Sequence, residues 1–185
     1  MRFKPITEQN MSDAQREVFH EICNGPRGHL GPPSSVTIRS PELARHTQKV
    51  GEYIRFGSPL RGRIMEFVIL IAARYWSSQY VWYAHYPLAI KDGLSVEVAA
   101  DLAHGRRPSG MKDDEAAAYD FCTELTNTKE VSDAVFNNAI KHFGELGVVV
   151  LMGGSAYYTL QSMALKVNQA EVPNDGKVPP LPKLS

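Results

Sequence analysis

The segment from residue 60 to 76 constrains the fold more than any other, because nearly every position in it is apolar. Between Ile64 and Ala73 the only charged residue is Glu66. A helix that is apolar on all sides cannot lie on a protein surface, so this segment predicts a central helix with other elements packed around it. Ser58-Pro59 supplies a typical start, with a serine at the N-cap and a proline at the first helical position. We therefore predict a helix from residue 58 to about 76.

Helix starts followed by apolar residues at helical spacing recur along the rest of the chain, while strand signals are nearly absent. The predicted fold class is therefore all-α, in a single domain that spans residues 1–185. The other predicted helices cover residues 12–23, 40–57, 78–93, 95–104, 112–127, 132–143 and 146–168, with a Gly/Pro loop at 25–33 and an extended Pro-rich tail at about 171–185.

The balance of charge excludes one large class of partners. Lys and Arg number 20, Asp and Glu also number 20, and the formal net charge is zero. Without a basic field the chain is not expected to bind nucleic acid. The longest apolar runs, 64–73 and 147–156, are about half of the roughly 20 residues that a membrane span needs. We expect no membrane partner and, because no apolar stretch follows the first charged residues, a cytoplasmic protein.

Cysteine and histidine spacing predicts neither a redox pair nor a metal site. Cys23 and Cys122 lie far apart and belong to no CxxC pattern. We interpret both as small buried side chains in a reduced compartment. The remaining histidines have no ligand-like spacing, so no metal and no cofactor is expected.

Glu66 is the residue most in need of an explanation, because an unpaired carboxylate in an apolar helix is costly. A short connection should make the helices 58–76 and 78–93 antiparallel neighbours. On the second helix Ser78, Trp82 and His85 lie on one face by their spacing. Glu66 and His85 can therefore face each other. Two structural alternatives stay open: an ion pair of Glu66 with Arg63 or Arg74, and a hydrogen-bonded core histidine at position 85.

These residues resemble a known signature, that of the carboxymuconolactone decarboxylase-like and AhpD-like superfamily. Its peroxidase branch carries a glutamate, then a CxxC pair, then a histidine four residues after the second cysteine. Here Glu66 and His85 match, while Ser78 and Val81 fill the cysteine positions. The resemblance covers about residues 55–105. Two further stretches, 25–33 and 144–158, are similar to a longer branch of the superfamily. The resemblance is therefore to a longer branch that lacks the CxxC redox pair.

The resemblance implies an AhpD-like helical bundle with added N- and C-terminal segments. It also implies a homo-oligomer, a trimer or hexamer or else a dimer. A thiol peroxidase needs a thiolate and a nearby resolving thiol, which Ser78 and Val81 cannot supply. The usual peroxidase mechanism is therefore disfavoured, although a peroxidase that uses Cys23 or Cys122 would remain open if either sulfur reached His85.

The leading hypothesis is an enzyme that performs cofactor-free acid–base chemistry, a decarboxylation or a related lyase or isomerase reaction. The substrate class is a small carboxylate or lactone from aromatic degradation. His85 and Glu66 are the predicted catalytic residues, because an imidazole donates and accepts protons near neutral pH. The predicted substrate-binding residues are Tyr80, Trp82, Ser78, Arg27 and Tyr157.

Several of these residues have simpler alternatives. Ser78 is expected to act mainly as a helix-start hydroxyl, since a serine nucleophile needs an adjacent base. Tyr80, Trp82 and Tyr157 can equally be core or interface residues. Arg27 and His29 lie in a loop from which they could reach a substrate carboxylate. The whole chain can also be an AhpD-like family member without the usual cysteines, or a non-catalytic ligand-binding oligomer. An enzyme should keep an open pocket beside His85, whereas an assembly protein should bury Glu66 and His85 as a closed pair.

Overall fold

The computed structural model describes residues 1–184, and within them every regular element is a helix. This confirms the all-α prediction. In chain order the elements are the 3-10 turn η1 (Glu8–Asn10), α1 (Asp13–Asn24), α2 (Pro32–Thr37), α3 (Pro41–Glu52), the π-helical turn η2 (Tyr53–Gly57), α4 (Arg63–Tyr75), α5 (Gln79–Lys91), α6 (Val96–Ala103), α7 (Asp113–Thr128) and α8 (Asp133–Asn168).

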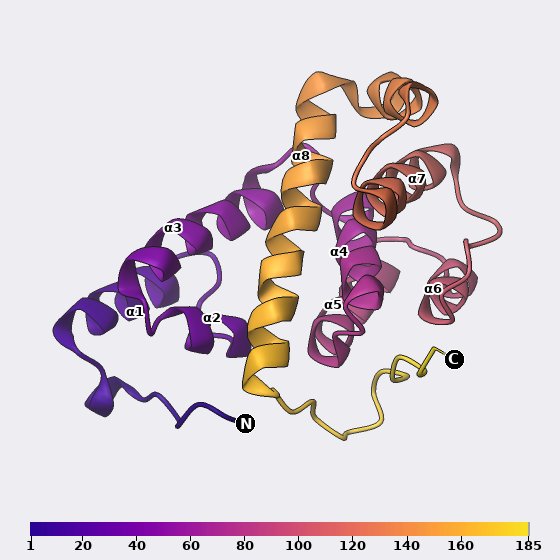
Figure 1. Cartoon of the computed structure of the whole chain (residues 1–185). Helices are drawn as coiled ribbons and strands as arrows, with labels where there is room; N and C mark the ends of the chain where they lie inside the picture. The colour runs from indigo at the N-terminus through magenta and orange to yellow at the C-terminus, as the bar shows by residue number, and fades with distance from the viewer. Residues whose placement is uncertain (185) are drawn as a thin grey trace.

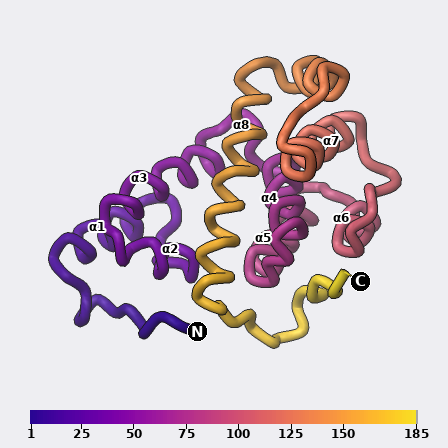
Figure 2. The backbone as a smooth tube through the Cα atoms, viewed as in Figure 1, coloured from indigo at the N-terminus to yellow at the C-terminus, as the bar shows by residue number. Residues whose placement is uncertain are grey.

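The long helix α8 runs through the middle of the molecule and separates two groups of helices. In Figure 1, α1, α2 and α3 lie on one side of it, and α4 to α7 lie on the other. The tube in Figure 2 shows the same division, with the N-terminus near the lower end of α8 and the C-terminal segment running from that end toward α6. Because α8 contacts α2, α3, α4, α5 and α7, it joins the two groups. Any site between them is therefore built from segments distant in the sequence.

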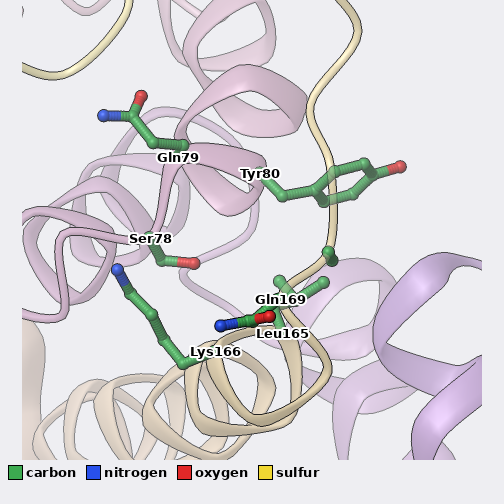
Figure 3. A pocket seen from close by; sticks show the side chains of 7 residues that line it. Ser78, Gln79, Tyr80, Leu165, Lys166 and Gln169 are labelled. Atoms are coloured by element: carbon green, nitrogen blue, oxygen red, sulfur yellow. The ribbon is translucent and has the colours of Figure 1, made fainter. Parts of the chain in front are cut away.

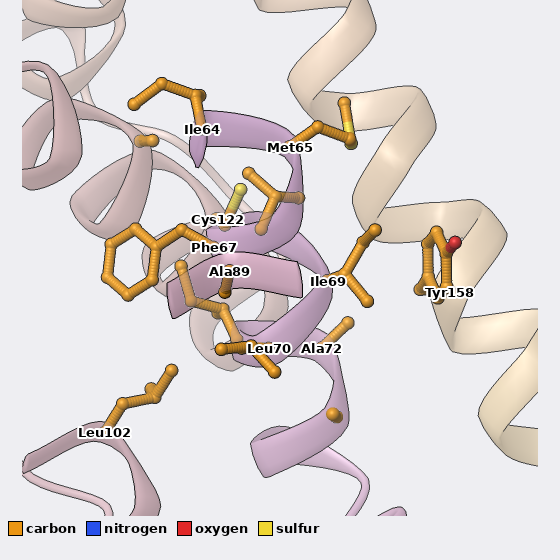
Figure 4. Close-up of a cluster of buried hydrophobic side chains, with 14 of the residues drawn as sticks. Ile64, Met65, Phe67, Ile69, Leu70, Ala72, Ala89, Leu102, Cys122 and Tyr158 are labelled. Atoms are coloured by element: carbon orange, nitrogen blue, oxygen red, sulfur yellow. The ribbon is translucent and has the colours of Figure 1, made fainter. Parts of the chain in front are cut away.

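Helix α4 occupies the centre of the larger hydrophobic core. Every residue from Ile64 to Arg74 is buried. Figure 4 shows α4 side chains meeting Leu102 of α6, Cys122 of α7 and Tyr158 of α8. Each fully buried aliphatic or aromatic side chain stabilises the fold by about 1.5–3 kcal/mol. The apolar run that suggested a central helix thus has the predicted role.

A glycine sets the distance between α4 and α8. A Cβ atom at Gly154 would lie 2.8 Å from the Sδ of Met65. The missing side chain therefore lets the two helices approach closely. The neighbouring Gly153 has nothing within 4 Å of the corresponding position and points away from the core.

Two details of the predicted helices are wrong. The central helix begins at Arg63 and not at residue 58, because the Ser58 hydroxyl donates to the Ile54 carbonyl 2.9 Å away and so closes the preceding turn. The chain then turns through Gly62, whose φ of 85° suits glycine. The short helix α2 was not predicted at all, since its six residues are too few for a recognisable period.

The two predicted helices 132–143 and 146–168 form the single element α8 with a break at Gly144 (φ 65°, ψ 178°). By length and composition α8 could cross a membrane, but 61% of the residues in its most apolar window are buried inside the protein. That burial is typical of a central core helix. A smaller hydrophobic cluster lies apart from the main core and joins the N-terminal helices; it contains Met11, Val18, Ile22, Ile38 and Ala44.

The segment after α8 is extended and lies along α5. Gln79 exchanges two hydrogen bonds with the backbone of Leu181, at 2.7 and 3.0 Å. The indole of Trp82 donates to the Pro179 carbonyl at 3.1 Å. These bonds hold the tail against α5, and Figure 1 shows it as the yellow coil that leaves the lower end of α8 and passes below α5.

Candidate active site

Glu66 and His85 form a direct pair between α4 and α5. The Nδ1 atom of His85 lies 2.7 Å from the Oε2 atom of Glu66, and each residue is 8% exposed. Neither arginine considered in the sequence analysis pairs with this carboxylate. Arg63 binds Asp114 and Glu115, and Arg74 donates to the carbonyls of Ala103 and Pro182. The partner of Glu66 is therefore the histidine.

This pairing fixes which nitrogen of His85 is available for chemistry. A carboxylate only accepts hydrogen bonds, so Nδ1 carries the proton that it shares with Glu66. In the neutral imidazole Nε2 is then the atom with a free lone pair. The ring also packs edge-on against Tyr158, with centroids 5.0 Å apart and planes at 84°. Burial raises the pKa of Tyr158, so its hydroxyl stays neutral and the imidazole faces no phenolate.

A cavity of about 120 Å³ lies beside His85, at the junction of the N-terminal helices with α5 and α8. Its apolar walls come from Val81 and Ala84 of α5 and from Pro32 and Pro33 at the start of α2. Its polar walls come from Arg27, His29, Arg55, Tyr80, His85, Tyr157, Tyr158 and Gln161. The structure thus brings His85 together with three of the residues predicted to bind substrate: Arg27, Tyr80 and Tyr157.

Arg27 is held across the cavity by Tyr157. Its Nη2 atom donates to the Tyr157 hydroxyl at 2.8 Å. Burial raises the pKa of Tyr157, and the nearby charges of Arg27 and Arg55 oppose that shift. The contact depends on Gly51 of α3, because a Cβ there would overlap both the Tyr157 hydroxyl and the Arg27 guanidinium. The glycine therefore makes room for this pair.

Two polar residues of the cavity were missed in the sequence analysis. Arg55 lies in η2 and Gln161 in α8, and both line the same space as His85. A signal for Arg55 existed, since positions 51 and 55 share one face of a helical turn. Gln161 likewise follows Tyr157 by four positions. Both signals can be interpreted only once Tyr157 is known to line the cavity and Gly51 to lie against it.

The other two residues predicted to bind substrate, Ser78 and Trp82, do not line the cavity beside His85. Ser78 lines a different, open cavity of about 430 Å³, together with Lys166 and Gln169 (Figure 3). It occupies the N-cap of α5 but accepts no capping hydrogen bond. Trp82 is 1% exposed and points under the C-terminal tail. Tyr80 lies between the two regions and lines both cavities.

Neither cysteine lines the cavity beside His85. Cys122 is buried on α7, where burial raises the pKa of its thiol to about 12. Such a thiol is protonated at neutral pH and is a poor nucleophile. Cys23 of α1 is half-buried, and not buried as expected. Within residues 1–184, no group of three or more His, Cys, Asp or Glu side chains could hold a metal ion.

Comparison with known proteins shows the fold. No protein-family model matches the chain, and no curated protein matches it. Among solved structures it is similar to an uncharacterised peroxidase-related protein with an AhpD core from Ralstonia eutropha JMP134, at 16% identity and a TM-score of 0.75, over 94% of this chain and 92% of that one.

Two further solved structures agree. A peroxidase-related protein from Silicibacter sp. TM1040 matches at 14% identity and a TM-score of 0.70, over 92% of this chain and 86% of that one. A protein of unknown function from Agrobacterium tumefaciens, proposed to be the antioxidant-defence protein AhpD, matches at 18% identity and a TM-score of 0.66, over 75% of this chain and 96% of that one. The chain therefore has an AhpD-like fold, and likeness at this level of identity carries no reaction with it.

Proposed function

We propose that this chain is a cofactor-free acid–base enzyme, with His85 as general acid and base and Glu66 as the residue that orients it. The observation that supports this most is the 2.7 Å pair at the wall of a cavity. A histidine with Nδ1 held by a carboxylate presents Nε2 in a fixed direction, as proton transfer requires. The proposed reactions are decarboxylation, or a related elimination or isomerisation, of a small carboxylate or lactone.

The proton balance of such a decarboxylation fits one histidine. The bond between the substrate carbon and its carboxylate breaks, carbon dioxide leaves, and the electron pair stays on the carbon and its conjugated neighbours. The protonated imidazole then delivers its Nε2 proton to that carbon and returns to the neutral form. Positioned general acid–base groups of this kind contribute about 10²–10⁴-fold to a rate. A proton from water then restores the charged imidazole, which Glu66 stabilises through its contact with Nδ1.

The peroxidase alternative has less support, although two of the structurally similar proteins are described as peroxidase-related. Thiol peroxidases attack the peroxide with a thiolate. Ser78 and Val81 stand where the resemblance would require cysteines, and Ser78 does not line the cavity beside His85. Peroxide reduction by this chain is therefore expected to stay at the level of a cysteine-free control.

Self-association of the chain is also proposed, because α8 has an apolar outer face. Leu146, Val149 and Met152 are exposed on one half of it, and Met163 and Val167 on the other. Gly153 lies between the two halves, with open space at the position of a Cβ. A glycine inside a helix costs about 1 kcal/mol relative to alanine, and no contact among residues 1–184 requires it here. Close approach of a second copy would explain both features.

Light scattering during size-exclusion chromatography tests this assembly. Val149→Glu should convert an oligomer of the natural sequence into a monomer, while Glu145→Gln, at the end of the same face, should not. A monomer for the natural sequence would contradict the proposal.

The enzyme proposal is tested with a panel of small carboxylates and ring-cleavage lactones that includes γ-carboxymuconolactone. Carbon dioxide release and exchange of substrate protons for deuterium are measured for the natural sequence, His85→Ala and His46→Ala. His46 is a suitable control because its side chain is 75% exposed. We expect His85→Ala to lose at least about 100-fold in rate and His46→Ala to be unchanged. Turnover within about threefold in His85→Ala would contradict the assignment.

A further inference from the structure

The two arginines of the cavity have no acidic partner, a feature that they share with Arg39 and Arg74 but not with the other half-buried arginines, Arg16, Arg45 and Arg63. Among residues 1–184, no carboxylate lies within 4.0 Å of Arg27 or Arg55. The single hydrogen bond of the Arg27 guanidinium goes to the neutral Tyr157 hydroxyl. Arg55 makes no side-chain hydrogen bond within that range and packs over the Phe56 ring at 5.0 Å. The guanidinium groups of Arg27 and Arg55 therefore line one small cavity without a carboxylate between them.

The Nε donors of both arginines are also unused. The Nε atoms of Arg27 and Arg55 are buried and have no hydrogen-bond partner. Arg39, Arg45 and Arg74 share that feature, but each has other partners. The terminal nitrogens of Arg39 and Arg74 donate to backbone carbonyls, at 2.6 and 2.9 Å, and Arg45 is paired with three glutamates. Arg55 has no such alternative partner within the described chain. A buried donor without a partner destabilises the protein, and a ligand acceptor would remove that cost.

No other group in the cavity balances this charge. Glu66 is engaged with His85 and is not among the lining residues. Tyr157 and Tyr158 remain neutral, because burial raises the pKa of each. His29 lies at the exposed rim. The cavity therefore presents positive charge opposite the imidazole of His85.

We infer that this cavity binds a single carboxylate group, held between Arg27 and Arg55 and placed next to Nε2 of His85. A guanidinium offers two parallel N–H donors to the two oxygens of a carboxylate, which suits a planar anion. The Tyr157 hydroxyl accepts from Arg27, so its own proton is free to be a further donor. The inference rests on the proposed function only in naming the substrate class, since binding does not require turnover.

The size of the cavity limits the ligand. Its volume is about 120 Å³. An apolar protein cavity of about 150 Å³ holds a benzene molecule, so this one suits a molecule of about five heavy atoms, or the carboxylate end of a longer one. Propionate has this size and charge, and propionamide has the same shape without the charge. The pair is therefore a suitable probe.

The experiment measures the dissociation constants of propionate and propionamide by ligand-observed NMR. The proteins are the natural sequence, Arg27→Gln, Arg55→Gln and Arg61→Gln. Arg61 is an exposed arginine outside the cavity and serves as the matched control. We expect propionate to bind at least about tenfold more tightly than propionamide, and each cavity variant to lose about tenfold or more, because charge-assisted hydrogen bonds are lost. Arg61→Gln should bind like the natural sequence.

A direct readout is the Nε–H resonances of Arg27 and Arg55 in protein labelled with ¹⁵N-arginine. Both should shift when propionate is added and stay in place with propionamide. Thermal unfolding checks that the variants fold. If Arg55→Gln does not fold, Arg55→Lys replaces it; lysine keeps the charge but lacks the fork, so propionate binding should fall by an intermediate amount.

Three results would overturn the inference: equal binding of propionate and propionamide, unchanged propionate binding in Arg55→Gln, or tighter binding of inorganic phosphate than of propionate. Failure of the proposed function looks different. In His85→Gln, propionate binding should stay within about threefold, because the arginines carry it. A protein that binds propionate and turns over no carboxylate would keep the binding site and lose the enzyme proposal.

Discussion

Helix α4 contributes to two buried polar clusters that differ in one respect. At its N-terminal end, Arg63 binds both Asp114 and Glu115 of α7, and we call these three residues the ionic cluster. One turn later, Glu66 binds His85, which faces Arg27 and Arg55 across a cavity, and we call these four residues the cavity cluster. The ionic cluster pairs its charges internally. Within the described chain, the cavity cluster leaves two cations without an acidic partner and one imidazole nitrogen without a hydrogen bond.

The difference separates a structural role from a functional one. Removing one member of a buried ion pair leaves the other charge uncompensated and destabilises the fold. A cluster with unused donors at a cavity instead costs stability until a ligand arrives. Burial alone would not have distinguished them, because Glu115 and Glu66 are 2% and 8% exposed. What distinguishes the two clusters is whether each charged group has an oppositely charged partner within the described chain.

The largest expected effect on stability comes from Arg63→Gln. Glu115 would then be a buried carboxylate without its cation, and the free energy of unfolding should fall by about 2–4 kcal/mol. Urea denaturation measures this loss. Carboxylate binding by the protein that remains folded should not change. A matching loss of binding would show that the two clusters act as one.

Gly51→Ala should weaken carboxylate binding, which Arg63→Gln leaves unchanged, and should lower stability less than Arg63→Gln does. The added methyl group would displace Arg27 and Tyr157, so propionate binding should fall by about tenfold. Overpacking of this kind typically costs about 1–3 kcal/mol, partly offset by the better helix propensity of alanine. Parallel binding and denaturation measurements separate the two effects. Unchanged propionate affinity would mean that the present position of Arg27 is not required for carboxylate binding.

The smallest expected effect is on the acid side of the stability curve. Burial would raise the pKa of Asp114, but its hydrogen bond and ion pair with Arg63 outweigh that and hold the pKa below its usual value. A carboxyl with a depressed folded pKa stabilises the protein above its unfolded pKa, about 3.9. That stability is lost as the pH falls through the lower folded pKa. Unfolding curves between about pH 5 and 2 should show this loss, and Arg63→Gln should reduce it.

The sequence predicted most of the helices because their signals are local. Serine caps and apolar periods located α1, α3 and α5 to α8, and the break in α8 falls between the two predicted helices. The start of α4 was misplaced because the Ser58 hydroxyl has two possible uses, a cap for the next helix or a bond to the previous turn. Only the fold shows that Ile54 receives it.

The candidate site was predictable only in part, for a related reason. Glu66 and His85 lie on adjacent helices, so spacing and a short connection brought them together. The cavity, however, joins a loop near Arg27, a turn at Arg55 and the middle of α8, which contact one another through long-range packing. No local pattern encodes that meeting. Ser78 and Trp82 share the helix of His85 but face the C-terminal tail or a different cavity.

The docking of the C-terminal tail, the segment after α8, also determines when this segment folds relative to the helices. Its hydrogen bonds to Trp82, Gln79 and Arg74 join residues 97, 102 and 108 positions apart. Closing loops of that length costs entropy that only an already formed surface can repay. The tail should therefore fold last and open first, as a separate unit of low protection. Hydrogen exchange at the Leu181 amide would then report opening of the tail while the bundle stays closed.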